Sequence, residues 1–114
     1  MSRYELHLQA QPFESIKAER KKIEMRLYDE KRQKYSVGDE LLFTKVDSEE
    51  KLLTKIKDLK RYKNFDELYK NNDKIDLGYA EDEEAKPDDM NKYYSTEQQK
   101  KYGVLGIEIE VIEE

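Results

Sequence analysis

The sequence predicts an α+β fold: a small, curved, mixed β-barrel of about five strands whose ends are closed by short helices. Apolar and polar residues alternate in several short segments, most clearly over residues 105–111, which is typical of strands with one buried face. The segments with helical patterns are all short, whereas a parallel βαβ sheet requires longer crossover helices. Strands and helices are also mixed along the chain rather than strictly alternating.

The first half of the chain contains four predicted strands and one helix. Alternation predicts strands over residues 4–8 and 21–27, and Pro12 suits the first turn of a short helix between them. A turn at Gly38 precedes a strand over residues 41–46, which has apolar residues on both faces. The last of these strands begins near residue 52, and its change of phase near Asp58 predicts a β-bulge.

The second half contains two short helices, an irregular segment and the final strand at 105–111. Asn64, followed by Glu67, is typical of a helix N-cap, and Ser95 with Gln98 forms a capping-box signature. Between these helices, residues 72–92 show no clear periodicity and include acidic residues at 81–84, 88 and 89. We expect this acidic segment to be a solvated loop.

Composition limits the classes of function that the chain can have. We expect a single domain spanning residues 1–114. The absence of cysteine excludes disulfides, thiolate catalysis and cysteine-based metal centres. Neither a signal segment nor a membrane span is found in the sequence, so we expect a cytoplasmic protein. We also expect no metal and no cofactor, because the chain has no cysteine and its acidic run lacks calcium-loop spacing. Residues 1–63 carry a net charge of +4 and residues 64–114 a net charge of -9, which indicates either an anionic partner or an acidic solvated loop.

The predicted strand at 21–27 has a charged face that could serve structure or function. Lys22, Glu24 and Arg26 alternate with apolar residues and should form an exposed row, with Lys21 at its entry. Such a row can pair internally as a surface ladder of small energetic value. It can also bind an anionic ligand, because the guanidinium group is a planar fork of donors suited to phosphate.

The pattern Lys21-x-x-Glu24-x-Arg26, followed by Val37-Gly38-Asp39 and the closing residues 102–108, resembles the ASCH domain family over nearly the whole chain. This resemblance implies a PUA-like β-barrel linked to RNA, with a cleft lined by Lys21, Glu24 and Arg26. The family motif reads G-x-K-x-x-E-x-R, and Glu19 replaces its glycine here. If that glycine lets backbone approach a ligand, Glu19 adds bulk and negative charge beside the site.

Three functions follow from the resemblance and the charge distribution. The first is binding of RNA or a nucleotide through the charged cleft, and the residues expected to bind are Lys21, Lys22, Glu24, Arg26, Tyr28, Arg32 and Tyr94. The second is a hydrolase acting on a modified nucleoside or on RNA, in which Lys21 and Glu24 would be the catalytic candidates. Glu24 occupies the position of the threonine nucleophile of amidohydrolase relatives, and a carboxylate replaces a hydroxyl nucleophile poorly. The third is a protein-interaction module that uses the acidic second half.

Aromatic residues near these charges have two possible roles. Tyr28, in the basic connection that contains Arg32, could stack on bases or pack at the barrel rim. The same choice applies to Tyr93, Tyr94 and Tyr102. Tyr94 and Tyr102 have partners at helical spacing, so at least one of these two should pack in the core. The chain has one histidine, His7, so a pair of catalytic histidines is excluded within one chain.

Overall fold

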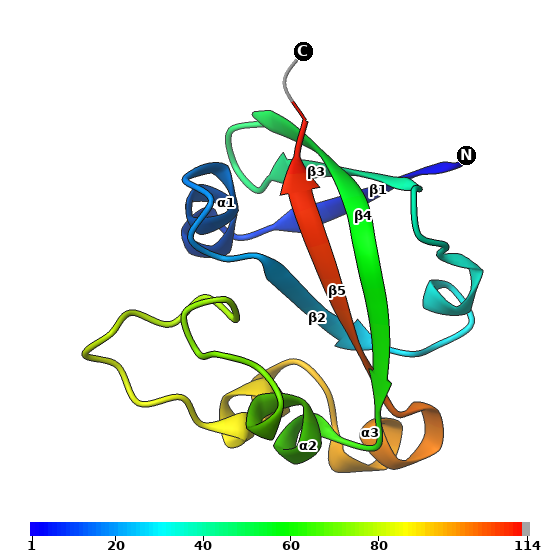
Figure 1. Ribbon diagram of the computed structural model, residues 1–114, viewed down its shortest axis with the longest axis vertical. Helices are drawn as coiled ribbons and strands as arrows, with labels where there is room; N and C mark the ends of the chain where they lie inside the picture. Colours follow the sequence, from blue (N-terminus) through cyan, green and yellow to red (C-terminus); the bar gives the residue numbers. More distant parts are fainter. Residues whose placement is uncertain (113–114) are drawn as a thin grey trace.

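The computed structural model describes residues 1–112 and contains a five-stranded sheet with short helices at its ends (Figure 1). The strand order is β1-β3-β4-β5-β2, in which β1 and β3 are parallel and all other neighbours are antiparallel. The elements are β1 (Arg3–Leu8), α1 (Ala10–Lys17), β2 (Ile23–Leu27), the 3-10 helix η1 (Arg32–Lys34), β3 (Glu40–Lys45), β4 (Lys51–Tyr62), α2 (Phe65–Lys70), the 3-10 helix η2 (Pro87–Lys92), α3 (Thr96–Tyr102) and β5 (Val104–Val111).

The sheet curves into a mixed half-barrel, so the predicted fold class is confirmed. The edge strands β1 and β2 are not hydrogen-bonded to each other, which leaves one side of the barrel without a continuous backbone ladder. The parallel β1–β3 pair is joined by a long connection that includes α1, β2 and η1. This route explains how parallel strands occur without a crossover helix of the βαβ type.

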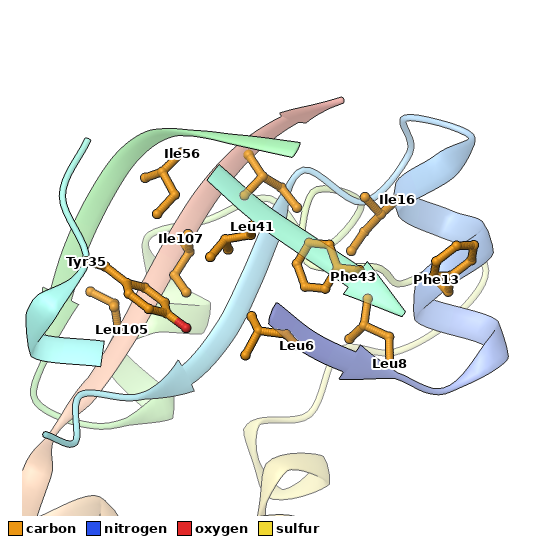
Figure 2. Packing of buried hydrophobic residues seen from close by; sticks show 11 residues of the cluster. Leu6, Leu8, Phe13, Ile16, Tyr35, Leu41, Phe43, Ile56, Leu105 and Ile107 are labelled. Carbon is orange, nitrogen blue, oxygen red and sulfur yellow. The ribbon is translucent and has the colours of Figure 1, made fainter. Parts of the chain in front are cut away.

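Two apolar clusters hold the elements together. The first covers one face of the sheet and takes residues from β1, β3, β4, β5 and α1, with Phe13 and Phe43 fully buried (Figure 2). The second lies between the other face of β2 and the segment that contains α2 and η2, and includes Met25, Phe65 and Leu68. The apolar residues of β2 face this second cluster, whereas Glu24 and Arg26 point to the opposite side and are also largely covered, so neither face of β2 is solvated.

The local signals in the sequence agree with most of the observed elements. The Asn64 side chain accepts a hydrogen bond from the backbone of Glu67, and Ser95 forms the predicted capping box with Gln98. The register shift in β4 lies between Ile56 and Asp58, as the change of phase predicts. The two 3-10 helices lie in segments that we expected to be irregular, and β2 begins two residues later than predicted. Within residues 1–112, no helix is both long and apolar enough to cross a membrane.

Candidate nucleotide-binding cleft

A cleft of about 530 Å³ lies where β1 and β2 face each other without hydrogen bonding. Its lining combines the end of β1, the start of α1, the middle of β2 and several side chains from residues 69–94. The lining residues that bear on binding are His7, Lys21, Glu24, Arg26, Tyr69, Tyr79, Asp89, Tyr93 and Tyr94. The break in the barrel therefore becomes a site with both charged and aromatic walls.

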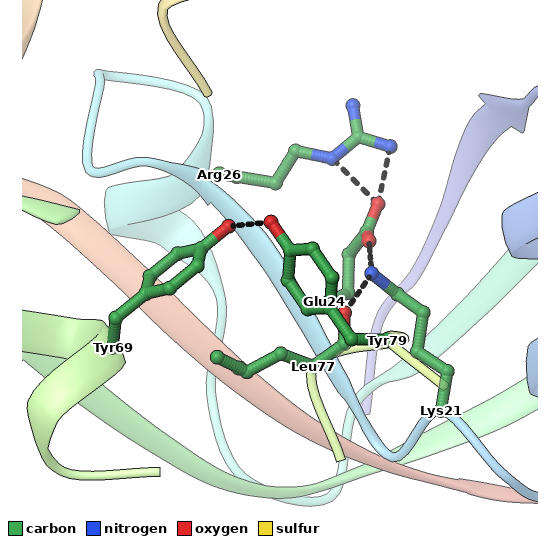
Figure 3. Close-up of polar contacts among 6 residues, drawn as sticks. All are labelled: Lys21, Glu24, Arg26, Tyr69, Leu77 and Tyr79. Carbon is green, nitrogen blue, oxygen red and sulfur yellow. Dashed lines mark hydrogen bonds and ion pairs between the residues drawn. The ribbon is translucent and has the colours of Figure 1, made fainter. Parts of the chain in front are cut away.

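Lys21, Glu24 and Arg26 form one connected ionic cluster in this cleft (Figure 3). Glu24 Oε1 lies 3.3 Å from Lys21 Nζ, and Glu24 Oε2 accepts from Arg26 Nε at 2.9 Å and from Nη2 at 2.7 Å. The side chains of Lys21, Glu24 and Arg26 are 8%, 6% and 16% exposed. The cluster is thus largely removed from solvent while still lining the cleft.

The prediction that Glu24 and Arg26 lie on an exposed face is wrong, and the sheet register explains why. Glu24 pairs with Ile107 and Arg26 with Leu105, so their side chains share the face that carries the first apolar cluster. The curvature of the sheet folds this face inward. Alternation along β2 therefore separates two buried faces, one apolar and one ionic, rather than a buried face from a solvated one.

A tight turn after α1 places Lys21 at the start of β2. Arg20 N donates to Ser15 O and Glu19 N donates to Ile16 O, which is the hydrogen-bond pattern of a Schellman motif. Glu19 occupies the left-handed position of this motif, with φ of 62°. Glycine suits that position because it has no Cβ, so the motif glycine is explained by backbone conformation. Glu19 is not among the residues that line the cleft, and the expectation that it stands beside a ligand is not supported.

Lys21 is fixed from its other side by the segment after α2. Its Nζ donates to Leu77 O at 3.2 Å, and its aliphatic stem packs against Gly78. A Cβ at position 78 would lie 3.1 Å from Lys21 Cδ, and Gly78 has φ of 107°, a conformation that residues with a side chain rarely adopt. Gly78 therefore provides both the turn and the space that the lysine stem needs.

The cluster carries a net charge of +1 inside a mostly buried wall. Burial opposes ionisation of Glu24, but the charges of Lys21 and Arg26 prevail and hold its pKa below the ordinary value. Burial also opposes the charge on Arg26, yet the neighbouring Glu24 raises the pKa of this guanidinium. Both cations are consequently retained beside a single carboxylate, which favours a ligand group that is anionic or rich in electron lone pairs.

Tyrosines from the second half of the chain form another wall of the cleft. Tyr69 and Tyr79 approach with their hydroxyl oxygens 2.8 Å apart, and Tyr79 donates to Asp89 Oδ2 at 2.8 Å. Burial raises the pKa of Tyr69, and burial together with hydrogen bonds to Tyr69 and Asp89 raises that of Tyr79. Both phenols are therefore protonated at neutral pH and form a chain of hydroxyl groups that ends at a carboxylate.

Tyr93 and Tyr94 are adjacent in sequence and differ in exposure. Tyr94 packs against the second cluster, and its ring is stacked at 6.0 Å from that of Phe65 while it also lines the cleft. Burial raises the pKa of Tyr94. Tyr93 is 68% exposed at the cleft, although an aromatic ring of this size is usually covered. Tyr102 packs in the second cluster, as we expected of at least one of these tyrosines.

Three of the residues predicted to bind lie outside the lining of this cleft. Lys22 is exposed, and its backbone groups bond to Asp76 and Ile109. The ring of Tyr28 lies under the Arg61 guanidinium, 4.1 Å from its centroid. Arg32 forms an ion pair with Asp29 at 3.3 Å and its side chain is 13% exposed. Their place in binding stays a prediction, whereas Lys21, Glu24, Arg26 and Tyr94 are brought together.

The acidic segment has a structural part and an exposed part. Residues 81–84 are exposed, as expected, but Asp89 is partly covered and bonds to Tyr79. Residues 1–112 contain no group of three or more acidic or histidine side chains placed to hold a metal ion.

Tyr69, Tyr79, Gly78 and Asp89 are the cleft residues that sequence reasoning missed. Tyr69 lies in the helix that the sequence predicts after Asn64, but a helical pattern alone does not indicate a cleft. The other three lie in the segment without periodicity, where spacing gives no indication of position. The glycine itself is a sequence signal at position 78, because glycine is the residue that most readily takes a positive φ or allows close approach of the backbone.

Comparison with known proteins agrees with this architecture. The ASCH domain family model matches residues 6–113. A crystal structure of the hypothetical protein PH0355 is 34% identical with a TM-score of 0.82, covering 96% of this chain and 99% of that one. A solution structure of protein PF0455 from Pyrococcus furiosus is 33% identical with a TM-score of 0.69, covering 98% of this chain and 99% of that one. No functionally curated protein matches. The ASCH domain has a PUA-like fold that is often linked to RNA binding, and the chain belongs to the ASCH domain family.

Proposed function

We propose that this protein binds a nucleotide, either free or as an unpaired nucleotide of RNA, in the cleft between β1 and β2. The observation that carries the proposal is the buried cluster with a net charge of +1 in the wall of a cleft that tyrosines also line. A nucleotide combines the two matching properties, because it has oxygen acceptors and a flat base that stacks on aromatic rings.

Donors for such a ligand remain available in the cluster. Arg26 donates to Glu24 through Nε and Nη2, whereas Arg26 Nη1 makes no hydrogen bond to residues 1–112. The Lys21 ammonium has three protons and two partners, Glu24 and Leu77. Both cations can therefore bind a phosphate or a base carbonyl without leaving Glu24.

The size and charge of the protein favour a small, local site. A volume of about 530 Å³ lies within the usual range for small-molecule sites. The net charge of -5 disfavours broad contact with an RNA backbone, which relies on many phosphate contacts. Exposed Tyr93 offers a ring on which the base can stack. An unpaired nucleotide fits these features better than a duplex does.

Substitution of the two cations tests the proposal. Lys21→Met and Arg26→Met should each weaken binding of mononucleotides or short RNAs by about 1–3 kcal/mol, because each removes a charged donor. Lys57→Met is a matched control, since Lys57 is half exposed and pairs with Glu110 away from the cleft. Binding is measured by isothermal titration and by chemical-shift changes at residues 21–26. If the folded Lys21 and Arg26 variants bind as tightly as the Lys57 variant, the proposal is wrong.

Hydrolysis and protein interaction are weaker alternatives. Both oxygens of Glu24 are engaged by cations, so this carboxylate is poorly suited to act as a base or a nucleophile. A protein partner on the acidic half would not compete with nucleotides for the cleft. Competition titration therefore separates the proposed function from such a partner.

A further inference from the structure

The hydrogen bonds between Tyr69, Tyr79 and Asp89 have a defined direction. A carboxylate or carbonyl oxygen can only accept, and Tyr79 approaches two such atoms, Asp89 Oδ2 at 2.8 Å and Lys86 O at 3.4 Å. The single hydroxyl proton of Tyr79 is therefore donated to Asp89, which is the nearer and the charged acceptor. The 2.8 Å contact between the two phenol oxygens then requires Tyr69 to be the donor and Tyr79 the acceptor.

This direction determines what Tyr69 presents to the cleft. Tyr69 donates its only hydroxyl proton to the Tyr79 oxygen in the contact drawn in Figure 3. The Tyr69 oxygen can therefore accept a hydrogen bond from a ligand but cannot donate one. The Glu24 carboxylate already accepts from both cations, including two hydrogen bonds to Oε2. Tyr69 is thus a neutral acceptor in a cleft whose other wall carries the donors Lys21 and Arg26.

We propose that Tyr69 selects nucleobases with an exocyclic amino group by accepting a hydrogen bond from that group. This inference rests on the proposed nucleotide-binding function and adds a ligand class to it. An amino group has a proton to donate to Tyr69, whereas an oxo group at the same place presents a second acceptor. Two facing acceptors without a proton between them lose the hydrogen bond and desolvate both groups. Lys21 and Arg26 would bind the oxygen atoms of the same ligand.

Matched amino and oxo nucleotides test this selection. The probes are adenosine and inosine monophosphates and cytidine and uridine monophosphates, each titrated against the full chain at fixed salt concentration. We expect the amino member of at least one pair to bind about five- to tenfold more tightly, the effect of one hydrogen bond. Equal affinities within both pairs, or tighter binding of the oxo members, would overturn the inference.

Two substitutions distinguish selection by Tyr69 from a general effect on the cleft. Tyr69→Phe removes the acceptor and should abolish the preference by weakening the amino member alone. Tyr79→Phe removes the oxygen that accepts the Tyr69 proton. Tyr69 can then donate this proton to a ligand, so the preference should shift toward the oxo member. Tyr62→Phe is the control, because the Tyr62 hydroxyl bonds to Asn72 away from the cleft. It should leave the preference unchanged.

The results also separate this inference from the proposed function. If all four nucleotides bind and depend on Lys21 and Arg26, but Tyr69→Phe retains the wild-type preference, only the role of Tyr69 is wrong. If none of them binds and short RNAs do not bind either, both proposals fail. Loss of folding would weaken both members of a pair alike. Weaker binding of the amino member alone in Tyr69→Phe, and a preference for the oxo member in Tyr79→Phe, therefore cannot arise from loss of folding.

Discussion

Glu24 should stabilise the fold more than a carboxylate in an exposed ion pair does, because two largely buried cations share it, and Glu24→Gln tests this. The substitution keeps the shape of the side chain but removes its charge and replaces one acceptor oxygen with an amide that donates. Glu24 Oε1 faces Lys21, and Oε2 faces two nitrogens of Arg26 at 2.9 and 2.7 Å. With glutamine, two largely buried cations remain beside a neutral group, and at least one of them loses its partner.

The expected cost follows from this burial. Removing one partner of a buried ion pair typically destabilises a protein by about 3–5 kcal/mol. For a chain of this length about 1 kcal/mol corresponds to roughly 4 °C in melting temperature, so the melting temperature of Glu24→Gln should fall by roughly 12–20 °C. Glu110→Gln is the control, because the Glu110 side chain is 57% exposed and pairs with Lys57 at 3.1 Å. An exposed pair of that kind contributes about 0–1 kcal/mol.

The assay is urea unfolding followed by circular dichroism, supported by thermal melts of the wild type and both variants. Two-state curves with similar slopes allow the free energies of unfolding to be compared directly. If Glu24→Gln is destabilised no more than Glu110→Gln, Glu24 is not the buried partner that holds the two cations in place.

Three further predictions concern the surroundings of this cluster. Glu19→Gly should stabilise the protein by about 1 kcal/mol in urea unfolding, because φ of 62° is strained for glutamate; a loss of stability would contradict the strain. Gly78→Ala should destabilise the protein by about 1–3 kcal/mol and weaken nucleotide binding, because the new Cβ would lie 3.1 Å from Lys21 Cδ; unchanged melting and affinity would contradict the close packing. Despite the opposing effect of burial, the two cations hold the pKa of Glu24 below 4.5, so its stabilisation is complete above that pH and is lost as the pH falls through the folded-state pKa. The stability difference between wild type and Glu24→Gln should therefore narrow only in acid, and urea unfolding across that range would show a constant difference if the reasoning is wrong.

Local signals in the sequence were sufficient to predict most of the fold. Alternation of apolar and polar residues predicts the strands. Side chains that can accept hydrogen bonds from the first backbone N–H groups of a helix predict the starts of α2 and α3. The bulge in β4 was visible because a register shift changes which residues face the core. These features depend on residues close together in the chain, and for this reason periodicity and capping chemistry reveal them.

The tyrosine wall could not be predicted in the same way, because it depends on contacts between distant segments. Tyr69 follows a helical pattern, but Tyr79 and Asp89 lie in a segment whose position is set by packing under β2. Their hydroxyl chain forms only when this segment folds back along the cleft. The number and type of the residues indicated nothing more than an acidic, aromatic loop.

The ionic face of β2 shows how one pattern can describe two different structures. Alternating charges at 22, 24 and 26 are typical of a solvated face, and for Lys22 that interpretation is correct. The sheet curvature and the pairing of Glu24 with Ile107 turn the next two charges inward. A buried ion pair gives little stability compared with apolar side chains of similar shape. Apolar side chains at all three positions could serve the fold equally well, so stability alone does not explain Lys21, Glu24 and Arg26. The proposed binding of an oxygen-rich ligand does explain them, because it needs two cations held in place by a carboxylate.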